Sequence, residues 1–565
     1  MGNFVKTQNS FANGDIAPEF YGNDNLHALS RLENMDVMAG GGLCRRAGLT
    51  TVTEIASGAR LVPFSAGMSQ NYLVALLPGH MYLYYGGVRI QDIVAPWTAD
   101  DIASVQYAQR FDTMIFVHPE YSPRILRRRA SQFTLDEFAF ARNDADMSRA
   151  QPFMRFDDTS DITITVTAHA SGNNYATFTT NRAFWNSNYV NTRIFAMDRQ
   201  WIIQEVTDST TAKAYTNGPF TLPSAPISEW RESAFSAARG WPVSITFHQD
   251  RLVFGGSRDY PAGVWMSRTG AHTNFDVGTG LDDQAIFITL LSSQRQQICT
   301  VVSSDNLQIL TTVGEWAISS KPLTPSSVDI KQHTSVGSIA TRFLAPQKIE
   351  GATVFVSRTG RDIRELDLDE LGENYNATDL CAFSKHLVQS PVDIAYNSAV
   401  RQMFVVRTDG KMAVLNQNSA LGISAWGLYT TAGEFKSVAV CGDETFVLVA
   451  RAGKFWIEKF DATQMLDAGV YTFDVVAAGL PLRASGHNAM RVRIRQVSVR
   501  IRDTRTLFIN GVRAALPDAT GFTGDVAVTT LGWTRNATGA PWTIHTNEPL
   551  PMTIMSVVVR GYYTI

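Results

Sequence analysis

The stretch Arg239–Ser257, RGWPVSITFHQDRLVFGGS, contains two β-strand patterns joined by a tight turn. In its first half, PVSITFH, apolar residues alternate with small or polar ones, which is typical of a strand with one exposed face. Gln249-Asp250 then turns the chain, and the second half, RLVFGGS, opens with a continuous apolar run that is typical of a more deeply buried strand. Pro242 stands at the first strand position, where its missing N–H is tolerated. The stretch therefore predicts a β-hairpin.

The same hairpin pattern recurs on both sides of this stretch. Arg60–Ile93 holds four β-patterns with short loops, and Thr113–Phe140 holds a second meander. Further units follow downstream: Ile298–Ser320, Thr353–Leu368, Val392–Trp426 and Phe435–Phe460. Their spacing of roughly 40–50 residues suits blades of four strands. Together with the central hairpin, these units predict a β-propeller of six to seven blades.

Regions outside these units have other patterns. Leu26, Leu29, Leu32 and Met35 fall at helical spacing and predict a helix, with Asn23 or Asp24 as its cap. Pro96–Asp101 is interpreted as the start of a second helix, with Thr98 as its N-cap and Asp101 three residues on. Ile102 and Val105 supply the apolar face of this helix. Residues 145–238 are rich in Gly, Asn and Thr and have short apolar runs, so we expect a small β-rich insertion.

The fold predicted is mainly β: a β-propeller-like platform with a small inserted β-rich domain and a C-terminal β-sandwich. The expected domains are an N-terminal arm and helix over 1–55, the first part of the propeller over 56–145, the inserted domain over 146–238, the second part of the propeller over 239–465 and the sandwich over 466–565.

Two arginine-rich strands are candidate contact surfaces. Arg491, Arg493 and Arg495 share one strand face, and after Gln496 the apolar phase reverses, which predicts a β-bulge. We interpret this ladder as a solvated or subunit-contacting face in preference to a phosphate contact. The run Arg124–Arg129 is interpreted as an exposed strand edge that its charges and the acidic Asp136-Glu137 protect, in preference to a nucleic-acid site.

Composition limits the class of protein. A chain of 565 residues is too long for one hydrophobic core, and a net charge of -3 argues against a general nucleic-acid binder. Cys44, Cys299, Cys381 and Cys441 are far apart and are expected to be buried free thiols in a reducing compartment. No signal peptide or uninterrupted apolar run of about 18 residues is seen, so we expect synthesis and folding in the cytoplasm.

The sequence holds no recognisable catalytic grouping. GxSxG and HExxH motifs are absent, no two histidines stand at ligand spacing, and the acidic spots lie beside predicted turns. We therefore predict no enzyme activity, no catalytic or metal residues and no cofactor. Propeller glycosidases draw carboxylates from separate blades, so spacing alone leaves that class open.

The chain resembles the tail nozzle family of short-tailed bacteriophages, also called tail tubular protein B. The resemblance spans residues 1 to about 460 and depends on the order of short segments. These are Phe11…Gly14, Ala17-Pro18-Glu19-Phe20, Leu32-Glu33-Asn34, Gly41-Gly42, Arg46-Ala47-Gly48, Leu61-Val62-Pro63-Phe64, Gln109…Asp112, His118-Pro119…Tyr121…Pro123, Gly240-Trp241-Pro242, Asp250-Arg251-Leu252, Thr311–Trp316, Arg364-Glu365-Leu366 and His386-Leu387.

This resemblance implies a structural virion protein without catalytic residues. Its subunits would form a homohexameric, six-fold ring below the tail adaptor (head-tail connector) protein and carry tail fibre or spike proteins. Genomic double-stranded DNA would pass through the lumen during ejection without specific binding, and no stable membrane insertion is expected. The protein would be made in the cytoplasm of the bacterial host and reside in the virion tail.

Two other readings stay open from the sequence. One is a glycan-binding or capsule-degrading tail protein that uses a propeller face, which would release sugar from host polysaccharide. The other is a host-cell propeller scaffold, which would form no high-order ring.

Overall fold

The computed structural model describes most of the chain and divides it into two compact units. Unit 1 is Met1–Ile102 with Leu344–Ile565, and unit 2 is Ala103–Phe343. The described residues are 2–21, 27–67, 70–130, 132–144, 147–369, 372, 374–464, 467, 473–477, 491–518, 520–529, 533–535, 542–546 and 548–564.

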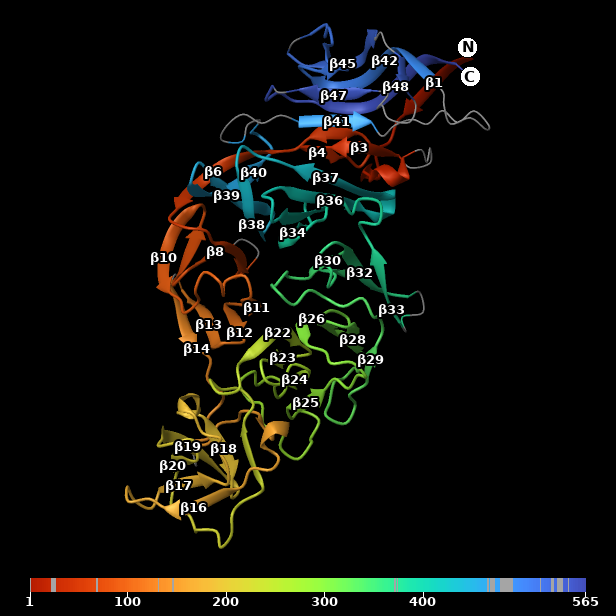
Figure 1. Cartoon of the computed structure of the whole chain (residues 1–565). Coiled ribbons are helices and arrows are strands. Elements are labelled where there is room, and N and C mark those ends of the chain that lie inside the picture. The colour runs from red at the N-terminus through yellow and green to blue at the C-terminus, as the bar shows by residue number, and fades with distance from the viewer. Residues whose placement is uncertain are drawn as a thin grey trace. The chain divides into compact units, whose positions relative to one another are not determined.

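Unit 2 contains three antiparallel sheets in which each of four strands pairs with the next along the chain (Figure 1). Their strands are β11 (Gln106–Arg110), β12 (Thr113–His118), β13 (Tyr121–Arg129) and β14 (Gln132–Glu137); β22 (Pro242–His248), β23 (Arg251–Ser257), β24 (Gly263–Met266) and β25 (Ile286–Thr289); and β26 (Ile298–Ser303), β27 (Leu307–Thr311), β28 (Glu315–Ile318) and β29 (Ile330–Gln332). The first strands are neighbours in turn: β11 contacts β22, and β22 contacts β26.

Unit 1 contains four meanders of four strands, three of them separate sheets and one, β34–β37, part of a larger sheet. Their strands are β7 (Arg60–Ser65), β8 (Asn71–Leu77), β9 (His80–Tyr85) and β10 (Val88–Val94); β30 (Gln347–Ile349), β31 (Ala352–Val356), β32 (Ile363–Leu368) and β33 (Tyr375–Asp379); β34 (Pro391–Asn397), β35 (Gln402–Arg407), β36 (Met412–Asn418) and β37 (Ile423–Tyr429); and β38 (Glu434–Cys441), β39 (Glu444–Arg451) and β40 (Lys454–Asp461) with β6 (Gly48–Ile55). Here too the first strands are neighbours: β30 contacts β34, β34 contacts β38, and β38 contacts β7.

Meanders of four strands whose first strands lie side by side are the blades of a β-propeller. The predicted propeller-like platform is therefore confirmed, and the described residues contain seven such blades, at the upper end of the expected six to seven. The last blade takes its fourth strand, β6, from the N-terminal part of the chain, where it pairs antiparallel with β40.

The hairpin predicted from Arg239–Ser257 is confirmed. His248 pairs with Arg251, and the two turn residues between them, Gln249 and Asp250, have φ of 43° and 58°. Positive φ at both central positions is the turn geometry that matches the twist of antiparallel strands. Strand β22 contains both buried and half-buried residues, whereas every residue of β23 is buried.

The N-terminal helix predicted around Leu29–Met35 is wrong. This segment forms strands β3 (Ala28–Leu32) and β4 (Met35–Val37), while Asn23, Asp24 and Leu26 lie outside the described residues. A register shift between Leu29 and Arg31 marks a bulge in β3. The extra residue lets Leu29 and Leu32 both be fully buried at a spacing of three, which imitates a helical pattern.

The helix predicted from Pro96 is also wrong, because the chain forms turns there before it enters β11. The backbone N–H and the hydroxyl of Thr98 both donate to Asp101 Oδ2, at 2.9 and 2.7 Å, so the capping interaction forms without a helix. Ile102 and Val105 are buried all the same. The helical elements of the described residues are short 3₁₀ helices: η1 (Pro18–Phe20), η2 (Asp157–Thr159), η3 (Ser187–Tyr189) and η4 (Ser419–Leu421).

The inserted β-rich domain is one sheet of seven strands between β14 and β22 (Figure 1, yellow). In spatial order its strands are β15 (Phe153–Met154), β21 (Trp230–Ser233), β18 (Arg193–Ala196), β19 (Arg199–Val206), β20 (Thr211–Tyr215), β17 (Tyr175–Thr180) and β16 (Ile164–Ala168). One face of the sheet builds the core of the domain around Phe178, Trp201 and Trp230. The alternate side chains point to the opposite face.

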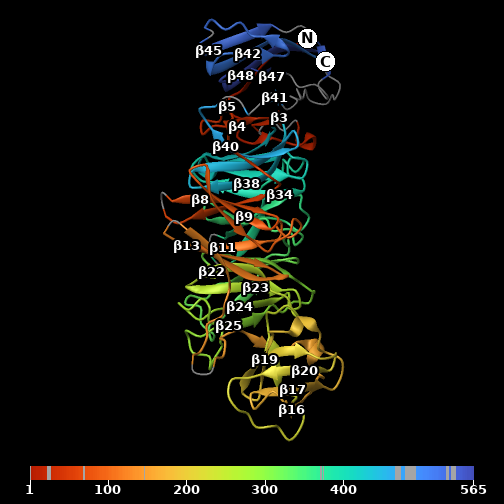
Figure 2. The ribbon, with the colours of Figure 1, turned by 90° about the vertical axis from the view of Figure 1, so that its left-hand side faces the viewer.

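The C-terminal β-sandwich includes strands from the N-terminal part of the chain, which lie beside the C-terminal strands in Figure 2. One sheet contains β1 (Gly2–Gln8), β4, β5 (Leu43–Arg45), β42 (Arg491–Thr504), β45 (Phe522–Thr529), β46 (Trp533–Arg535) and β48 (Thr553–Thr564). The other contains β2 (Gly14–Asp15), β3, β41 (Phe473–Ala477), β43 (Phe508–Ile509), β44 (Val512–Arg513) and β47 (Thr543–Thr546), and it continues through β2 into β37. A shared core that includes Leu29, Val497 and Ile554 lies between the two sheets.

Candidate functional site

The arginine ladder lies on β42, where the predicted bulge is confirmed. The pairing of β42 with β48 shifts register between Ile494 and Gln496, and Ile494 and Val497 on either side of the shift are both buried. Arg493 and Arg495 are exposed, and Arg495 Nη1 donates to Tyr562 Oη at 3.0 Å. The side chain of Arg491 lies outside the described residues. Within the described residues no carboxylate pairs with Arg493 or Arg495, so their role as a subunit contact stays a prediction.

The run Arg124–Arg129 does not lie at a sheet edge, so that part of the interpretation is wrong. These residues lie in β13, which pairs with β12 on one side and with β14 on the other. The charge pairing is confirmed, because Arg127 lies 3.5 Å from Asp136. Arg128 also lies 3.3 Å from Asp112. The run therefore lies on an inner strand of a blade, with two of its four arginines paired with aspartates.

A cleft within unit 2 that the sequence did not reveal is a candidate basic site. It has a volume of about 770 Å³ and lies between the outer face of the inserted sheet and the β22–β25 blade. The residues of the inserted sheet in the cleft are Phe153, Arg193, Phe195, Gln200, Ile202, Tyr215 and Arg231. Trp265, Phe287 and the segment 274–278 form the opposite wall, and residues 141–152 pass between the two walls. We call this site the arginine cleft.

Strand register explains why these side chains meet. Phe195 lies opposite both Arg231 on β21 and Gln200 on β19, and Arg193 lies opposite Ile202. Residues directly opposite each other in a sheet point to the same face. Because Ile194 and Trp201 point into the domain core, their neighbours must point outward into the cleft.

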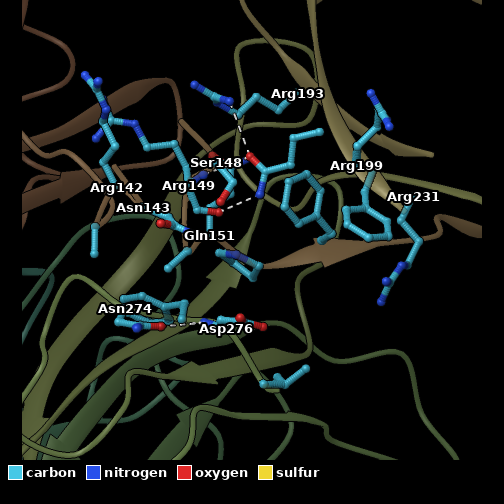
Figure 3. A pocket seen from close by; sticks show the side chains of 18 of the residues that line it. Arg142, Asn143, Ser148, Arg149, Gln151, Arg193, Arg199, Arg231, Asn274 and Asp276 are labelled. Carbon is cyan, nitrogen blue, oxygen red and sulfur yellow. Dashed lines mark hydrogen bonds between the residues drawn. The ribbon is translucent and has the colours of Figure 1, made fainter. Parts of the chain in front are cut away.

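Five arginines line the cleft, against two aspartates, Asp198 and Asp276. Figure 3 shows the arginines along one side and Asn274 with Asp276 on the other. The five arginines are Arg142, Arg149, Arg193, Arg199 and Arg231. Arg142 lies 3.7 Å from Asp144, but within the described residues the other four have no carboxylate partner. The cleft is therefore positively charged in a chain whose net charge is negative.

The four arginines without a carboxylate bind neutral groups. Arg149 Nη1 donates to Phe140 O at 2.8 Å, and Arg199 Nη1 donates to Pro219 O at 3.0 Å. Arg193 Nη1 donates to Gln200 Oε1 at 3.3 Å. The guanidinium of Arg231 lies over the Phe195 ring, 4.9 Å from its centroid. Neutral partners orient these guanidinium groups and leave their charges uncompensated.

Gln200 fixes the position of Arg149 beside Arg193. Its Oε1 also accepts from the backbone N–H of Arg149 at 2.9 Å, and its Nε2 donates to the Arg149 carbonyl at 2.8 Å (Figure 3). Burial lowers the pKa of Arg193, and the nearby charge of Arg149 lowers it further. Two like charges held together in a cleft without a counter-charge among the described residues make this part of the cleft a candidate anion site.

Aromatic rings form the rest of the cleft. Phe287 is 38% exposed and stacks on the buried Trp265, with ring centroids 5.3 Å apart. Phe153 and Phe195 lie beside each other at 5.7 Å. Ring surfaces next to guanidinium and amide groups can hold a ligand that has both apolar faces and anionic substituents.

Guanidinium, amide and aromatic groups line the cleft, and such groups are suited to ligand binding. Its two aspartates are accompanied by no histidine, cysteine or lysine among the described residues that line it. Across the described chain, no group of three or more His, Cys, Asp or Glu side chains is arranged to hold a metal ion. None of the helices in the described chain has the length and apolar character needed to cross a membrane.

No sequence motif marks the arginine cleft, because its residues come from separate strands and loops between positions 141 and 287. The sequence signal that could have found these residues is the alternation of side chains along a strand. In β18, Arg193 and Phe195 alternate with the core residue Ile194, and in β19, Gln200 precedes the core residue Trp201. This alternation indicates that Arg193, Phe195 and Gln200 point away from the domain core. Only the tertiary structure shows that Trp265 and Phe287 lie opposite them.

No protein-family model and no curated protein matches the sequence. Among solved structures, the chain is similar to BamB from Moraxella catarrhalis, with 12% identity over 73% of this chain and 100% of that chain and a TM-score of 0.33. It is also similar to the β-propeller domain of Cps50 (Swd1) from Myceliophteria thermophila, with 8% identity over 74% of this chain and 100% of that chain and a TM-score of 0.34.

Proposed function

We propose that this chain is a structural subunit of a short bacteriophage tail: a nozzle protein that forms a six-fold ring and serves as a conduit for genome ejection. Its partners are other copies of itself, the tail adaptor protein, tail fibre or spike proteins and the double-stranded DNA that passes through the lumen. The protein has no catalytic role in this proposal, and it resides in the virion tail.

The ordered series of segments that resemble the nozzle family carries this proposal. Two of these segments contain buried arginines that support the scaffold. Arg251 is 1% exposed and donates to the carbonyls of Ser267, Gln284 and Asp282 at 2.7, 2.6 and 2.8 Å. Arg46 is 2% exposed and pairs with Asp467. Residues of this kind support the fold and do no chemistry. A resemblance that depends on them suits a structural protein.

A ring also needs a surface that contacts the next subunit, and β10 offers one. It is the outer strand of its blade and pairs only with β9 among the described strands. Val88, Ile90 and Val94 on this strand are 66%, 43% and 79% exposed. An unpaired edge strand with exposed apolar side chains favours association with another chain, and a cyclic ring requires such head-to-tail contacts.

The charge balance fits a conduit for DNA. Each phosphate that a protein neutralises adds salt-dependent affinity, so a lumen that must release DNA should be poor in unpaired cations. A net charge of -3 is compatible with that requirement. We place the ladder of Arg491, Arg493 and Arg495 at contacts with subunits or tail proteins, away from the lumen.

The test is the mass of the purified full-length chain, measured by native mass spectrometry or mass photometry, followed by electron microscopy of the assembly. We expect a ring of six copies with the arginine ladder outside the bore. Replacing Val88 and Val94 together with glutamate should shift the protein to monomers. Val400→Glu is the matched control, because Val400 is 54% exposed in another blade, and it should leave the ring intact.

A protein that stays monomeric at high concentration, alone and with the adaptor protein, contradicts the proposal, as does an arginine ladder that lines the bore. Sugar released from host polysaccharide by the purified protein would favour a capsule-degrading protein instead.

A further inference from the structure

The arginine cleft has no ligand assigned to it, and its arginines without a carboxylate partner among the described residues favour an anionic one. Arg149, Arg193, Arg199 and Arg231 bind neutral groups alone within the described residues, and burial and mutual repulsion already lower the pKa of Arg193. An anion beside Arg149 and Arg193 would offset the repulsion between them and accept hydrogen bonds from planar guanidinium groups. Carboxylates, phosphates and sulfates have this chemistry.

The walls of the cleft narrow the class of ligand. The exposed Phe287 ring, the Phe153–Phe195 pair and the amides of Gln151 and Asn274 provide apolar faces next to neutral hydrogen-bonding groups. Sugar rings have one apolar C–H face and a rim of hydroxyls, so they match such walls. A simple inorganic anion would leave the aromatic surface without a partner.

The size of the cleft and its place in the fold favour a short segment of saccharide over nucleic acid. A volume of about 770 Å³ holds a short oligosaccharide, whereas a DNA duplex needs a long basic surface. Two arginines of the run on β13, Arg127 and Arg128, are paired with Asp136 and Asp112.

We propose that the arginine cleft binds an acidic saccharide, with the carboxylate of the sugar held by Arg193 and its arginine neighbours and a sugar ring packed against Phe287. A chain that carries this site on its inserted domain would bind an anionic glycan without cleaving it. Binding of an acidic saccharide is a function in addition to the proposed ring and conduit. It does not depend on ring formation, because one copy of the chain contains the whole cleft.

Isothermal titration of the full-length protein with defined probes tests the ligand class. The acidic probes are trigalacturonate, sialyllactose and a hyaluronan tetrasaccharide; the comparison probes are maltotriose, triglutamate and sodium phosphate. We expect at least one acidic saccharide to bind at least tenfold more tightly than every comparison probe, and high salt to weaken it. Failure of all three acidic saccharides to bind overturns the proposal. Equal binding of triglutamate or phosphate also overturns it, because the cleft would then recognise charge alone.

Variants locate the site. Combining Arg193→Gln with Arg231→Gln should weaken the acidic probe at least tenfold, and Phe287→Ala should weaken it severalfold. Arg182→Gln is the matched control, because Arg182 is an exposed arginine of the same domain that is paired with Asp161 at 2.8 Å. The affinity of this variant for the acidic probe should be unchanged. An equal loss in Arg182→Gln would show that the overall charge of the domain controls binding and would overturn the assignment.

Hydrogen exchange of the unmodified protein, measured with and without the probe, locates the binding site without the use of variants. The acidic probe should slow exchange in 193–202, 230–233 and 274–287, and the neutral probe should not. Protection confined to other parts of the chain overturns the proposal.

Discussion

Arg46 forms a salt bridge with Asp467 in which Nη2 lies 2.6 Å from Oδ2 and neither side chain has any exposed surface. Arg46 Nε also donates to Asn34 Oδ1 at 2.8 Å, and Nη2 donates to the Thr430 carbonyl at 2.8 Å. The pair joins the residues just before β6 to the segment that follows β40. It therefore holds together the start of β6 and the end of β40, which are paired neighbours in one blade.

We expect Asp467→Ala to lower the free energy of unfolding by about 3–5 kcal/mol, because it leaves a buried guanidinium without its counter-charge. Urea unfolding followed by fluorescence measures the change. Asp525→Ala is the control: it removes a pair with Arg500 whose two side chains are 63% and 61% exposed, and it should have little effect. Equal losses in the two variants would contradict the anchoring role of Arg46 and Asp467.

Asp36 should make stability depend on pH. Burial raises the pKa of its carboxyl from 3.8 to about 6, although the hydroxyl of Tyr429 donates to it. Between these two values the folded protein holds a proton that the unfolded chain has released, so the free energy of unfolding falls as pH rises, by up to about 3 kcal/mol. Urea unfolding between about pH 4 and pH 7 measures this slope.

Asp36→Asn separates this contribution from those of other carboxyls, because the amide can still accept from Tyr429 but does not titrate. The slope of stability against pH should be flatter in this variant than in the unchanged protein. Identical slopes in the two proteins would show that Asp36 titrates in the folded state as it does in the unfolded state.

Arg239 should stabilise the inserted domain near Asp158 and Glu232. Its guanidinium lies 2.8 Å from the fully buried Glu232, 2.9 Å from Asp158 and 4.3 Å from the centroid of the Phe156 ring. Arg239→Ala leaves the Glu232 carboxyl buried without this cation and should destabilise unit 2 by about 3–5 kcal/mol. Hydrogen exchange should become faster in the strands between 153 and 233. Adding Glu232→Gln should restore part of the loss, and no restoration would contradict this account.

The arginine cleft should reduce the stability of the protein without ligand. Arg193→Met keeps the apolar stem of the side chain and removes a charge that Arg149 repels. We expect this variant to raise the free energy of unfolding by about 0.5–1 kcal/mol, the usual sign of a binding site that is less stable than it could be. Thermal and urea unfolding check the change. A clear loss of stability would indicate that the charge of Arg193 supports the fold.

The four cysteines should react slowly in the folded protein. Burial raises the pKa of Cys44, Cys299, Cys381 and Cys441 to about 12, so thiolate is scarce near neutral pH. A colorimetric thiol reagent should label all four in denaturant and almost none without it. Rapid labelling of any one in the native protein would identify a site that opens locally.

Local pattern was enough where the alternation of side chains within one segment decides the structure. The hairpin at Gln249-Asp250 and the bulge after Ile494 were both predicted, because alternation along one strand shows which face is buried. The buried free thiols were predicted too: Cys299, Cys381 and Cys441 are buried and Cys44 is half-buried.

Prediction failed where the partner strand is distant in sequence. Strand β6 completes a blade with β40, about 400 residues away, and nothing local distinguishes it from an N-terminal arm. The spacing of Leu29 and Leu32 indicated a helix because a bulge in β3 brings both to one face. Propensity and spacing are weak evidence when packing against a distant strand decides the conformation.

The sequence by itself determined that the protein is mainly β, that it is built from repeated meanders, and that β22 and β23 form a hairpin whose second strand is the more buried. Alternation of side chains along a strand is a local property, so these features can be read one segment at a time. Only the tertiary structure decided that β6 closes the last blade and that four arginines lacking a carboxylate partner among the described residues meet around one cleft. Those features arise from contacts between residues far apart in the chain. They form because distant strands bury surface against each other in a defined register, and a single segment of sequence does not show which distant strand it will contact.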